Sequence, residues 1–146
     1  MANKVAKVVW KGDMTFEGLG STWPGGIIPL DAEEAVGGHD RGFRPLELLL
    51  VALAGCTAMD VISILRKKQQ AVTAFEVEVE GIQVEEHPRY FGTINVVYRV
   101  TGYNVDEKAV ARAIELSETK YCGASAMLRE KARITSRYEI LEAEQV

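Results

Sequence analysis

The chain has 146 residues, of which 47% are hydrophobic and 26% charged, and its formal net charge is −4 at neutral pH. These values exclude an intrinsically disordered chain and fit one folded domain over residues 1–146. Basic residues are scattered except at 66–68, so no cationic surface predicts nucleic acid as a partner. The N-terminal residues lack the apolar run of a signal peptide, and we therefore expect a cytoplasmic protein.

The first 44 residues predict short strands and loops. Residues 4–10 alternate in polarity as a strand does, 11–13 supply turn residues, and a second strand follows around 14–19. A short strand-like piece at 27–30 lies between two glycine-containing loops. The chain is therefore expected to open with a hairpin.

A long apolar helix is predicted next, over residues 46–65. Pro45 suits its first turn, and the segment is hydrophobic nearly all round. A membrane span is excluded because the uncharged stretch between Glu47 and Asp60 is too short to cross a bilayer. A helix of this kind needs more cover than one small sheet provides, so we expect a homodimer in which two central helices pack together.

The second half of the chain predicts strands at 75–79 and 93–100, joined as an antiparallel pair across 85–88. Asn104 is expected to cap a helix over 105–117.

A further helix should begin near Gly123, and a last strand is expected at 134–141. Strands on both sides of a long helix, with two shorter helices late in the chain, indicate an α+β fold with antiparallel sheets around the central helix.

The two cysteines, Cys56 and Cys122, each lie in an apolar segment with helical spacing. In a reducing compartment such a pair is a redox-active site, a sensor or plain core rather than a permanent bridge, and a bridge requires Cα atoms within roughly 7 Å. His39 and His87 lie far from both cysteines in the sequence, so we expect no metal and no cofactor.

The local sequence alone makes Cys56 unreactive. Apolar neighbours and Asp60 one turn away disfavour a thiolate, so a reactive Cys56 needs a cation folded onto it. Arg41 and Arg44, in the loop before the helix, are the candidates, and Glu47 is the residue that would orient the guanidinium. The alternative is that Cys56 is a core residue and that these charges are solvated.

The sequence also gives expectations for two further residues, Asp60 and Cys122. Asp60 in an apolar helix must be paired or hydrogen-bonded, so we expect it to anchor the helix against a serine, a helix end or a basic group. Cys122 lies where a new helix starts, so either the free amides there stabilise its thiolate or it is a small buried side chain that fills the junction.

Several motifs resemble those of the OsmC/Ohr family. They are Gly37-Gly38, the Arg44 to Leu50 segment RPLELLL, the Ala52 to Cys56 segment ALAGC, Leu65 to Lys68, and Lys120-Tyr121-Cys122. The match runs through the whole chain in element order, and it is closest to the YhfA-type OsmC-like branch.

The resemblance implies an OsmC-like intertwined homodimer that reduces organic hydroperoxides. Cys56 would be the peroxidatic cysteine and Cys122 the resolving cysteine, and an external dithiol such as that of a lipoylated protein would reduce the disulfide. The hydrocarbon part of the substrate would lie on an apolar part of the central helix, which comprises Leu49, Ala52, Leu53 and Met59.

Two departures from the Ohr pattern favour an alternative function. Leu46 stands where Ohr proteins place a glutamate, with Glu47 one residue later, and the hairpin turn at 11–14 contains no arginine. The alternative is a non-peroxidatic dimer of the same fold that binds a small apolar ligand, with the cysteines lining its pocket. A regulatory redox sensor is the third reading.

Overall fold

The computed structural model describes residues 3–144, and the chain divides into two compact units, residues 1–49 and 50–146. The ends of the expected domain, residues 1–2 and 145–146, lie outside the described residues. The first unit contains a small sheet and a loop, and the second contains a larger sheet covered by helices.

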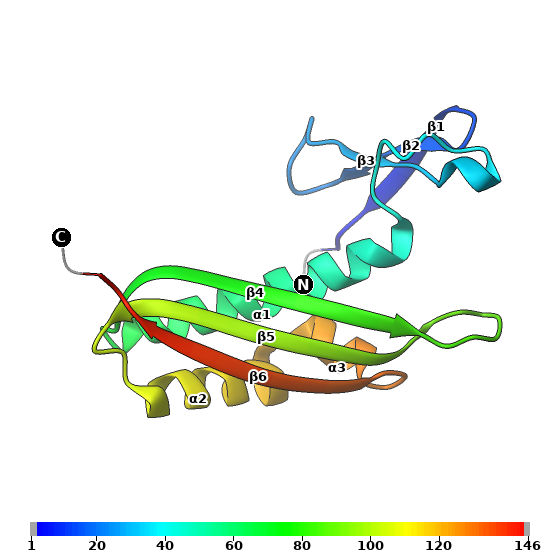
Figure 1. The fold of residues 1–146 in the computed structure, drawn as a ribbon. Coiled ribbons are helices and arrows are strands. Elements are labelled where there is room, and N and C mark those ends of the chain that lie inside the picture. Colours follow the sequence, from blue (N-terminus) through cyan, green and yellow to red (C-terminus); the bar gives the residue numbers. More distant parts are fainter. Residues whose placement is uncertain (1–2, 145–146) are drawn as a thin grey trace. The chain divides into compact units, whose positions relative to one another are not determined.

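The first unit is built on an antiparallel sheet with strand order β1-β2-β3 (Figure 1). Its strands are β1 (Ala6–Gly12), β2 (Thr15–Gly20) and β3 (Ile28–Leu30). The predicted hairpin and short third strand are therefore confirmed. Gly12 and Asp13 both have positive φ at the hairpin turn, a conformation that glycine and aspartate tolerate better than most residues.

Asp31 organises the loop that follows, which includes the short 3₁₀ helix η1 (Glu34–Val36). Its buried carboxylate accepts hydrogen bonds from the backbone amides of Ala32, His39 and Arg41, at 2.8, 3.1 and 3.2 Å. Burial opposes the charge, but the three amides outweigh it and hold the pKa of Asp31 below its ordinary value.

Helix α1 (Pro45–Lys67) begins with the predicted proline and ends with basic residues. The Glu47 side chain accepts a hydrogen bond from the Arg44 amide at 3.2 Å, as the third residue of a helix does in a capping box. By length and composition alone the helix is apolar enough to span a membrane. Its buried residues, Leu53, Thr57, Val61 and Leu65, repeat every four positions and form one stripe.

The sheet of the second unit has the order β4-β5-β6 and consists of β4 (Ala71–Gln83), β5 (Phe91–Tyr103) and β6 (Arg133–Glu142). β4 and β5 are antiparallel, as predicted, but β5 and β6 are parallel. The prediction of antiparallel sheets is therefore confirmed for the first sheet and for β4 with β5, and it is wrong for β5 with β6. The helical segments between β5 and β6 carry the chain back to the end of the sheet where β5 begins. The last strand therefore runs in the same direction as β5.

Three helical segments form that crossover: α2 (Glu107–Leu116), the π-helical turn η2 (Ser117–Tyr121) and α3 (Gly123–Leu128). Asn104 does not cap α2, because it adopts a positive φ of 49° in the turn after β5. The cap is Asp106, whose side chain accepts a hydrogen bond from the Lys108 amide at 3.0 Å. The predicted start of α3 at Gly123 is confirmed.

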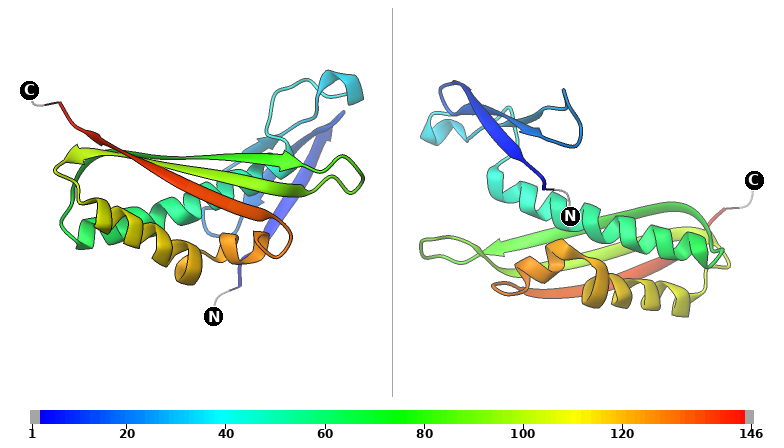
Figure 2. Two further views of the ribbon diagram at one scale, coloured as in Figure 1. Left: turned by 60° about the horizontal axis from the view of Figure 1, so that its bottom comes forward. Right: turned by 180° about the vertical axis from the view of Figure 1, so that it is seen from behind.

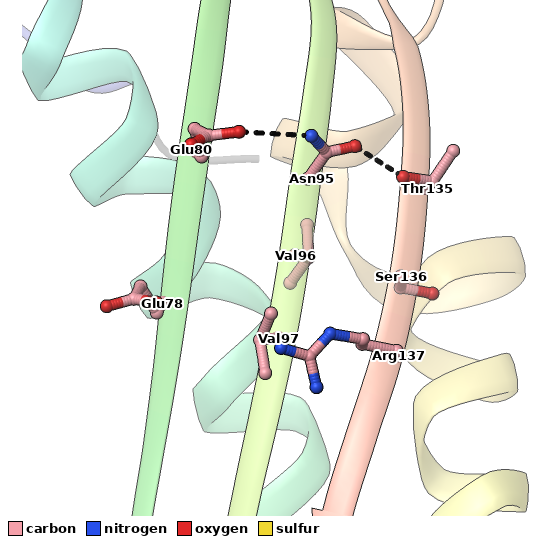
Figure 3. Close-up of a pocket in the computed structure, with 8 residues that line it drawn as sticks. All are labelled: Glu78, Glu80, Asn95, Val96, Val97, Thr135, Ser136 and Arg137. Carbon is pink, nitrogen blue, oxygen red and sulfur yellow. Dashed lines mark hydrogen bonds between the residues drawn. The ribbon is translucent and has the colours of Figure 1, made fainter.

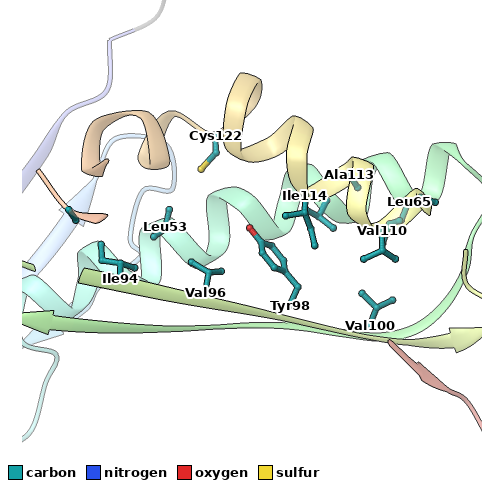
Figure 4. Packing of buried hydrophobic residues seen from close by; sticks show 13 residues of the cluster. Leu53, Leu65, Ile94, Val96, Tyr98, Val100, Val110, Ala113, Ile114 and Cys122 are labelled. Carbon is teal, nitrogen blue, oxygen red and sulfur yellow. The ribbon is translucent and has the colours of Figure 1, made fainter. Parts of the chain in front are cut away.

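Helices α1, α2 and α3 cover one face of this sheet (Figure 2). The core lies between the two layers (Figure 4). Its buried residues include Leu53, Val61 and Leu65 from α1, Ile94, Val96, Tyr98 and Val100 from β5, and Val110, Ala113 and Ile114 from α2. Alternate residues of β5 are buried, which is the pattern of a strand with one covered face.

Polar side chains occupy the other face of the sheet, where they line a shallow groove of about 400 Å³ (Figure 3). Asn95 of β5 is hydrogen-bonded to both neighbouring strands, donating to Glu80 at 3.2 Å and accepting from Thr135 at 2.6 Å. The alternation of polar and apolar residues predicted for these strands is explained by this two-sided environment.

Candidate functional site

Both cysteines belong to the second unit, and the fold brings them together. Cys56 is half-buried on α1, whereas Cys122 is buried between η2 and α3 with 3% of its surface exposed. Cys56 lies near enough to Cys122 to raise the pKa of its thiol. Two thiols far apart in the sequence therefore share one site, as a redox pair requires.

Cys122 is held as a neutral thiol. Burial raises its pKa most strongly, and the nearby Cys56 and Asp60 raise it further, while the Ser125 amide, 3.3 Å from Sγ, partly offsets these effects. The resulting pKa is about 11. Of the two readings of Cys122, a buried side chain at the helix junction describes its surroundings better than a stabilised thiolate does.

A chain of polar side chains runs through the core beside the two thiols. Thr57 of α1 is central to it, with its hydroxyl 2.7 Å from that of Ser117 and 2.8 Å from that of Tyr98. Ser117 in turn donates to Asp60 at 2.9 Å, and Tyr98 donates to Glu118 at 2.9 Å. The expectation that Asp60 anchors α1 against a serine is confirmed.

Tyr98 lies at the centre of the core on β5, with its hydroxyl directed toward the helices and Cys122 on the helical side (Figure 4). Its side chain is fully buried, and burial raises its pKa well above the ordinary value. The Glu118 carboxylate raises the pKa further, so the Tyr98 hydroxyl is a permanent donor at physiological pH. Glu118 also accepts a hydrogen bond from Ser136 of β6 at 3.3 Å.

The sequence analysis did not identify Thr57, Tyr98, Ser117 or Glu118. A signal was present at Thr57, since it is the one hydroxyl within the apolar stripe of α1 and a buried hydroxyl needs a partner. The π-helical turn η2 gave no such signal, although it places Ser117 and Glu118. Single π-helical turns are frequent at functional sites.

The predicted cationic partners, Arg41 and Arg44, belong to the first unit. The Arg44 guanidinium pairs with Asp40 and donates to the carbonyls of Gly42 and Asp31 at 3.3 and 3.4 Å. Glu47 accepts from the Arg44 backbone amide rather than from its guanidinium. The role of either arginine beside Cys56 stays a prediction.

The predicted substrate-contacting residues have different environments on α1. Leu53 is buried in the core, whereas Met59 is 73% exposed. Leu49 and Ala52 are exposed as well. The proposed contacts of these four residues with a substrate therefore stay predictions. Residues 3–144 contain no cluster of three or more His, Cys, Asp or Glu side chains arranged to hold a metal ion.

The family model described as OsmC-like protein matches residues 38–137, which include both cysteines. The chain belongs to the OsmC-like family. Among its curated relatives, the protein YhfA of Escherichia coli K12 is 40% identical over 138 residues, covering 94% of this chain and 98% of YhfA. The predicted resemblance to the OsmC-like family and its YhfA-type branch is therefore confirmed.

Two solved structures have the same fold. A hypothetical protein from Aquifex aeolicus VF5 is 30% identical, with a TM-score of 0.85 over 99% of this chain and all of that one. An organic hydroperoxide resistance protein from Elizabethkingia anophelis is 13% identical, with a TM-score of 0.67 over 98% of both chains. At that identity the second likeness shows the fold alone.

Proposed function

We propose that this OsmC-like protein reduces organic hydroperoxides by thiol chemistry at Cys56 and Cys122. The observation that carries the proposal is that the two cysteines, on separate elements of one unit, lie near each other. Membership in the OsmC-like family supports it, because structures of the same fold include organic hydroperoxide resistance proteins.

The reaction has three balanced steps. The Cys56 thiolate attacks one peroxide oxygen, the O–O bond breaks, and the alcohol leaves with a proton while Cys56 becomes a sulfenic acid. The sulfur of Cys122 then displaces that oxygen as water and forms an S–S bond with Cys56. An external dithiol, such as that of a lipoylated protein in a reducing cytoplasm, restores both thiols by exchange and is itself oxidised to a disulfide.

The surroundings of the two thiols suit this division of roles. Cys56 is half-buried and therefore nearer to an incoming substrate, whereas Cys122 is buried and neutral with a pKa of about 11. A neutral buried thiol is a poor first nucleophile, but it lies ready to react with a sulfenic acid on its neighbour. Arg41 or Arg44 supplies the positive charge that activates Cys56 in this proposal.

We further propose that the working form is a homodimer. Apolar side chains on α1 are left exposed, among them Val51 at 54% and Met59 at 73%. A second copy of the chain would cover them, as expected for a central helix that is apolar on most faces. The apolar part of α1 around Leu49, Ala52 and Met59 would then border the substrate site.

A second candidate function is the binding of a small apolar ligand without peroxide chemistry. Two observations favour it: the Arg44 guanidinium is already paired with Asp40, and the first unit contains an apolar cavity of about 330 Å³. Its lining includes Val8, Met14, Phe16 and Leu30. Neither cysteine lines this cavity, so it is not the cysteine-lined pocket expected from the sequence, and in this alternative Cys56 and Cys122 are packing residues.

Counting free thiols after a brief exposure to cumene hydroperoxide separates the two candidates. Peroxidase chemistry predicts the loss of both thiols of each chain and their recovery on addition of a dithiol. A chain with Cys122→Ser should stop at a sulfenic acid on Cys56, which a dimedone probe traps. Unchanged thiol counts after hydroperoxide would leave ligand binding as the function.

A further inference from the structure

The turn of α1 that carries Cys56 is hydrogen-bonded to the start of η2, the turn that leads to Cys122. Thr57 follows Cys56 directly on α1, and its hydroxyl lies 2.7 Å from that of Ser117, the first residue of η2. Ser117 also donates to Asp60, three residues further along α1, at 2.9 Å. The Ser117 side chain therefore contacts α1 at two places beside Cys56.

The backbone of the same serine contacts the second cysteine. The Cys122 amide donates to the Ser117 carbonyl at 2.8 Å, and this bond between residues five apart closes the π-helical turn η2. In an α-helical turn the same carbonyl would accept from Tyr121 instead. Two consecutive hydrogen bonds, from Thr57 to Ser117 and from Ser117 to Cys122, thus connect the segments of the two cysteines.

Glu118, the next residue of η2, holds the turn against the sheet and α3. Its carboxylate accepts hydrogen bonds from Tyr98 of β5 at 2.9 Å and from Ser136 of β6 at 3.3 Å. The guanidinium of Arg129, at the end of α3, donates to the Glu118 backbone carbonyl at 2.8 Å. The Tyr98 hydroxyl is also 2.8 Å from that of Thr57. The position of η2 is therefore set from α1, the sheet and α3 together.

The hydroxyls of this cluster are shielded from water. Thr57, Ser117 and Tyr98 each have at most 1% of their surface exposed. Within residues 3–144, no buried side-chain nitrogen or oxygen lacks a hydrogen-bond partner. A buried polar cluster whose members are all hydrogen-bonded favours one arrangement of the elements that carry them, because water cannot replace a contact that is lost.

A disulfide between Cys56 and Cys122 needs such an arrangement. The S–S bond is only about 2.05 Å long and requires Cα atoms within roughly 7 Å, so two elements that move independently would seldom meet this geometry. Cys56 already lies near enough to Cys122 to raise the pKa of its thiol. The Ser125 amide, 3.3 Å from the Cys122 sulfur, fixes the direction of that side chain.

We infer that Thr57 and Ser117 are positioning residues for the disulfide, and that their hydroxyl contact holds the Cys122 sulfur where it can bond to that of Cys56. They act through the position of η2 and do not touch the hydroperoxide. The inference rests on the proposed function in one respect, which is that the two cysteines form a disulfide.

Equilibration of the intact protein with mixtures of oxidised and reduced dithiothreitol tests the inference without hydroperoxide. In this exchange Cys56 and Cys122 lose two hydrogens and two electrons as the S–S bond forms, and the oxidised dithiothreitol gains them and becomes a dithiol. The equilibrium constant measures how well the two sulfurs are placed. Thr57→Val keeps the shape of the side chain but removes its hydroxyl, and it should lower the constant by about two- to tenfold, as expected for one lost hydrogen bond.

Three further variants separate positioning from stability. Thr57→Ser retains the hydroxyl and should stay near the wild type. Ser117→Ala removes the same contact from the other side and should lower the constant by a similar factor, which keeps the test open if Thr57→Val does not fold by circular dichroism. Leu65→Ala is the matched control, because it weakens the core on the same helix about two turns from Thr57 and should leave the constant unchanged.

The double variant Thr57→Val with Ser117→Ala gives a further readout. The contact can be lost only once, so the constant should fall by clearly less than the product of the two single effects. A fall equal to that product would overturn the inference.

Other outcomes would also overturn it: a constant that is unchanged or raised in the folded variants, a Thr57→Ser value as low as that of Thr57→Val, or a wild type that forms no disulfide in any mixture. Hydroperoxide consumption is measured separately. A chain whose constant changes as expected but which consumes no hydroperoxide would support the positioning role and contradict the proposed function. Unchanged constants together with normal consumption would contradict the positioning role alone.

Discussion

The two units of the chain differ sharply in how they bury apolar side chains. Every buried residue of the hydrophobic core in the described part of the chain lies in the second unit, and several are fully inaccessible. In the first unit, over residues 3–49, only Gly18, Asp31 and Gly38 are buried, while Trp10 and Trp23 are 65% and 77% exposed. The second unit therefore has its own hydrophobic core, and the first does not.

This contrast separates two sources of stability. The second unit encloses its core between a sheet and helices, and it also holds both cysteines and the hydrogen-bonded hydroxyls around Thr57. The first unit is organised by hydrogen bonds to Asp31 and by a hairpin, and its apolar side chains need cover from another surface. The proposed homodimer would provide that cover.

The largest expected effect tests where the chemistry resides. Cys56→Ser should reduce hydroperoxide consumption to the uncatalysed background, because no other thiol of the chain has the same access. Turnover with cumene hydroperoxide and a dithiol measures it. Arg41→Ala and Arg44→Ala, made separately, show whether the first unit contributes the activating cation. Full activity of the Cys56→Ser protein would disprove the assigned role.

The contrast in burial can be tested with one type of substitution on one helix. Leu65→Ala removes a fully buried side chain of the second unit and should lower the free energy of unfolding by about 2–5 kcal/mol. Leu46→Ala in the first unit removes a side chain that is 39% exposed and should cost within about 0.5 kcal/mol. Urea unfolding measures both changes.

The Leu46→Ala result also depends on association. If a second copy covers this side chain, the variant should dissociate at higher protein concentration than the wild type, as seen by analytical ultracentrifugation. Equal losses of unfolding free energy for Leu65→Ala and Leu46→Ala at high dilution would contradict the contrast between the units.

The buried thiol of Cys122 should make the stability of the second unit depend on alkaline pH. Its pKa is about 11 in the folded chain against an ordinary value of 9.0, so the folded state binds the proton more tightly. This thiol therefore does not change the free energy of unfolding below pH 9. As the pH rises from 9 toward 11, it lowers that free energy by roughly 2–3 kcal/mol. Unfolding midpoints across that range, compared with Cys122→Ser, should show a smaller slope in the variant.

The smallest expected effects concern the helix starts. Asp106→Ala removes the side-chain cap of α2 in the second unit and should cost about 1 kcal/mol. Glu47→Ala removes the contact with the Arg44 amide and should cost less, in the range of about 0.3–1 kcal/mol expected for an acidic residue in a first turn. Thermal unfolding measures both. A loss of turnover in Glu47→Ala without a loss of stability would assign Glu47 to the active site.

Local patterns in the sequence predicted the elements of the fold well. The turn residues at 11–13, the first-turn Pro45 and the alternation in 93–100 each act through neighbouring residues, and the structure has a hairpin, a helix and a strand at those places. The strands of the second sheet proved longer than predicted; β4, for example, covers Ala71–Gln83 rather than 75–79. Pairing along β5 extends a strand beyond the residues whose own pattern indicates it.

Features that depend on distant contacts were not predictable. The parallel direction of β6 follows from the crossover through α2 and α3, which no local pattern encodes. The partners of Thr57 lie on β5 and η2, so its hydroxyl looked like an isolated polar group in an apolar helix. The sequence made the two cysteines candidates for a redox pair and the family resemblance assigned their roles, but their proximity required the fold.

The position of β6 as the last element of the chain has a consequence for synthesis on the ribosome. This strand is made after every element that it packs against, and its Ser136 contributes the last hydrogen bond to Glu118. Nascent chains emerge from the N-terminus onward, so α1 with Cys56 and the segment with Cys122 leave the exit tunnel before the strand that completes their sheet. A chain still being synthesised therefore exposes both thiols and the edge of β5 with which β6 later pairs. Chaperones and thiol-reactive compounds could reach both before folding is complete.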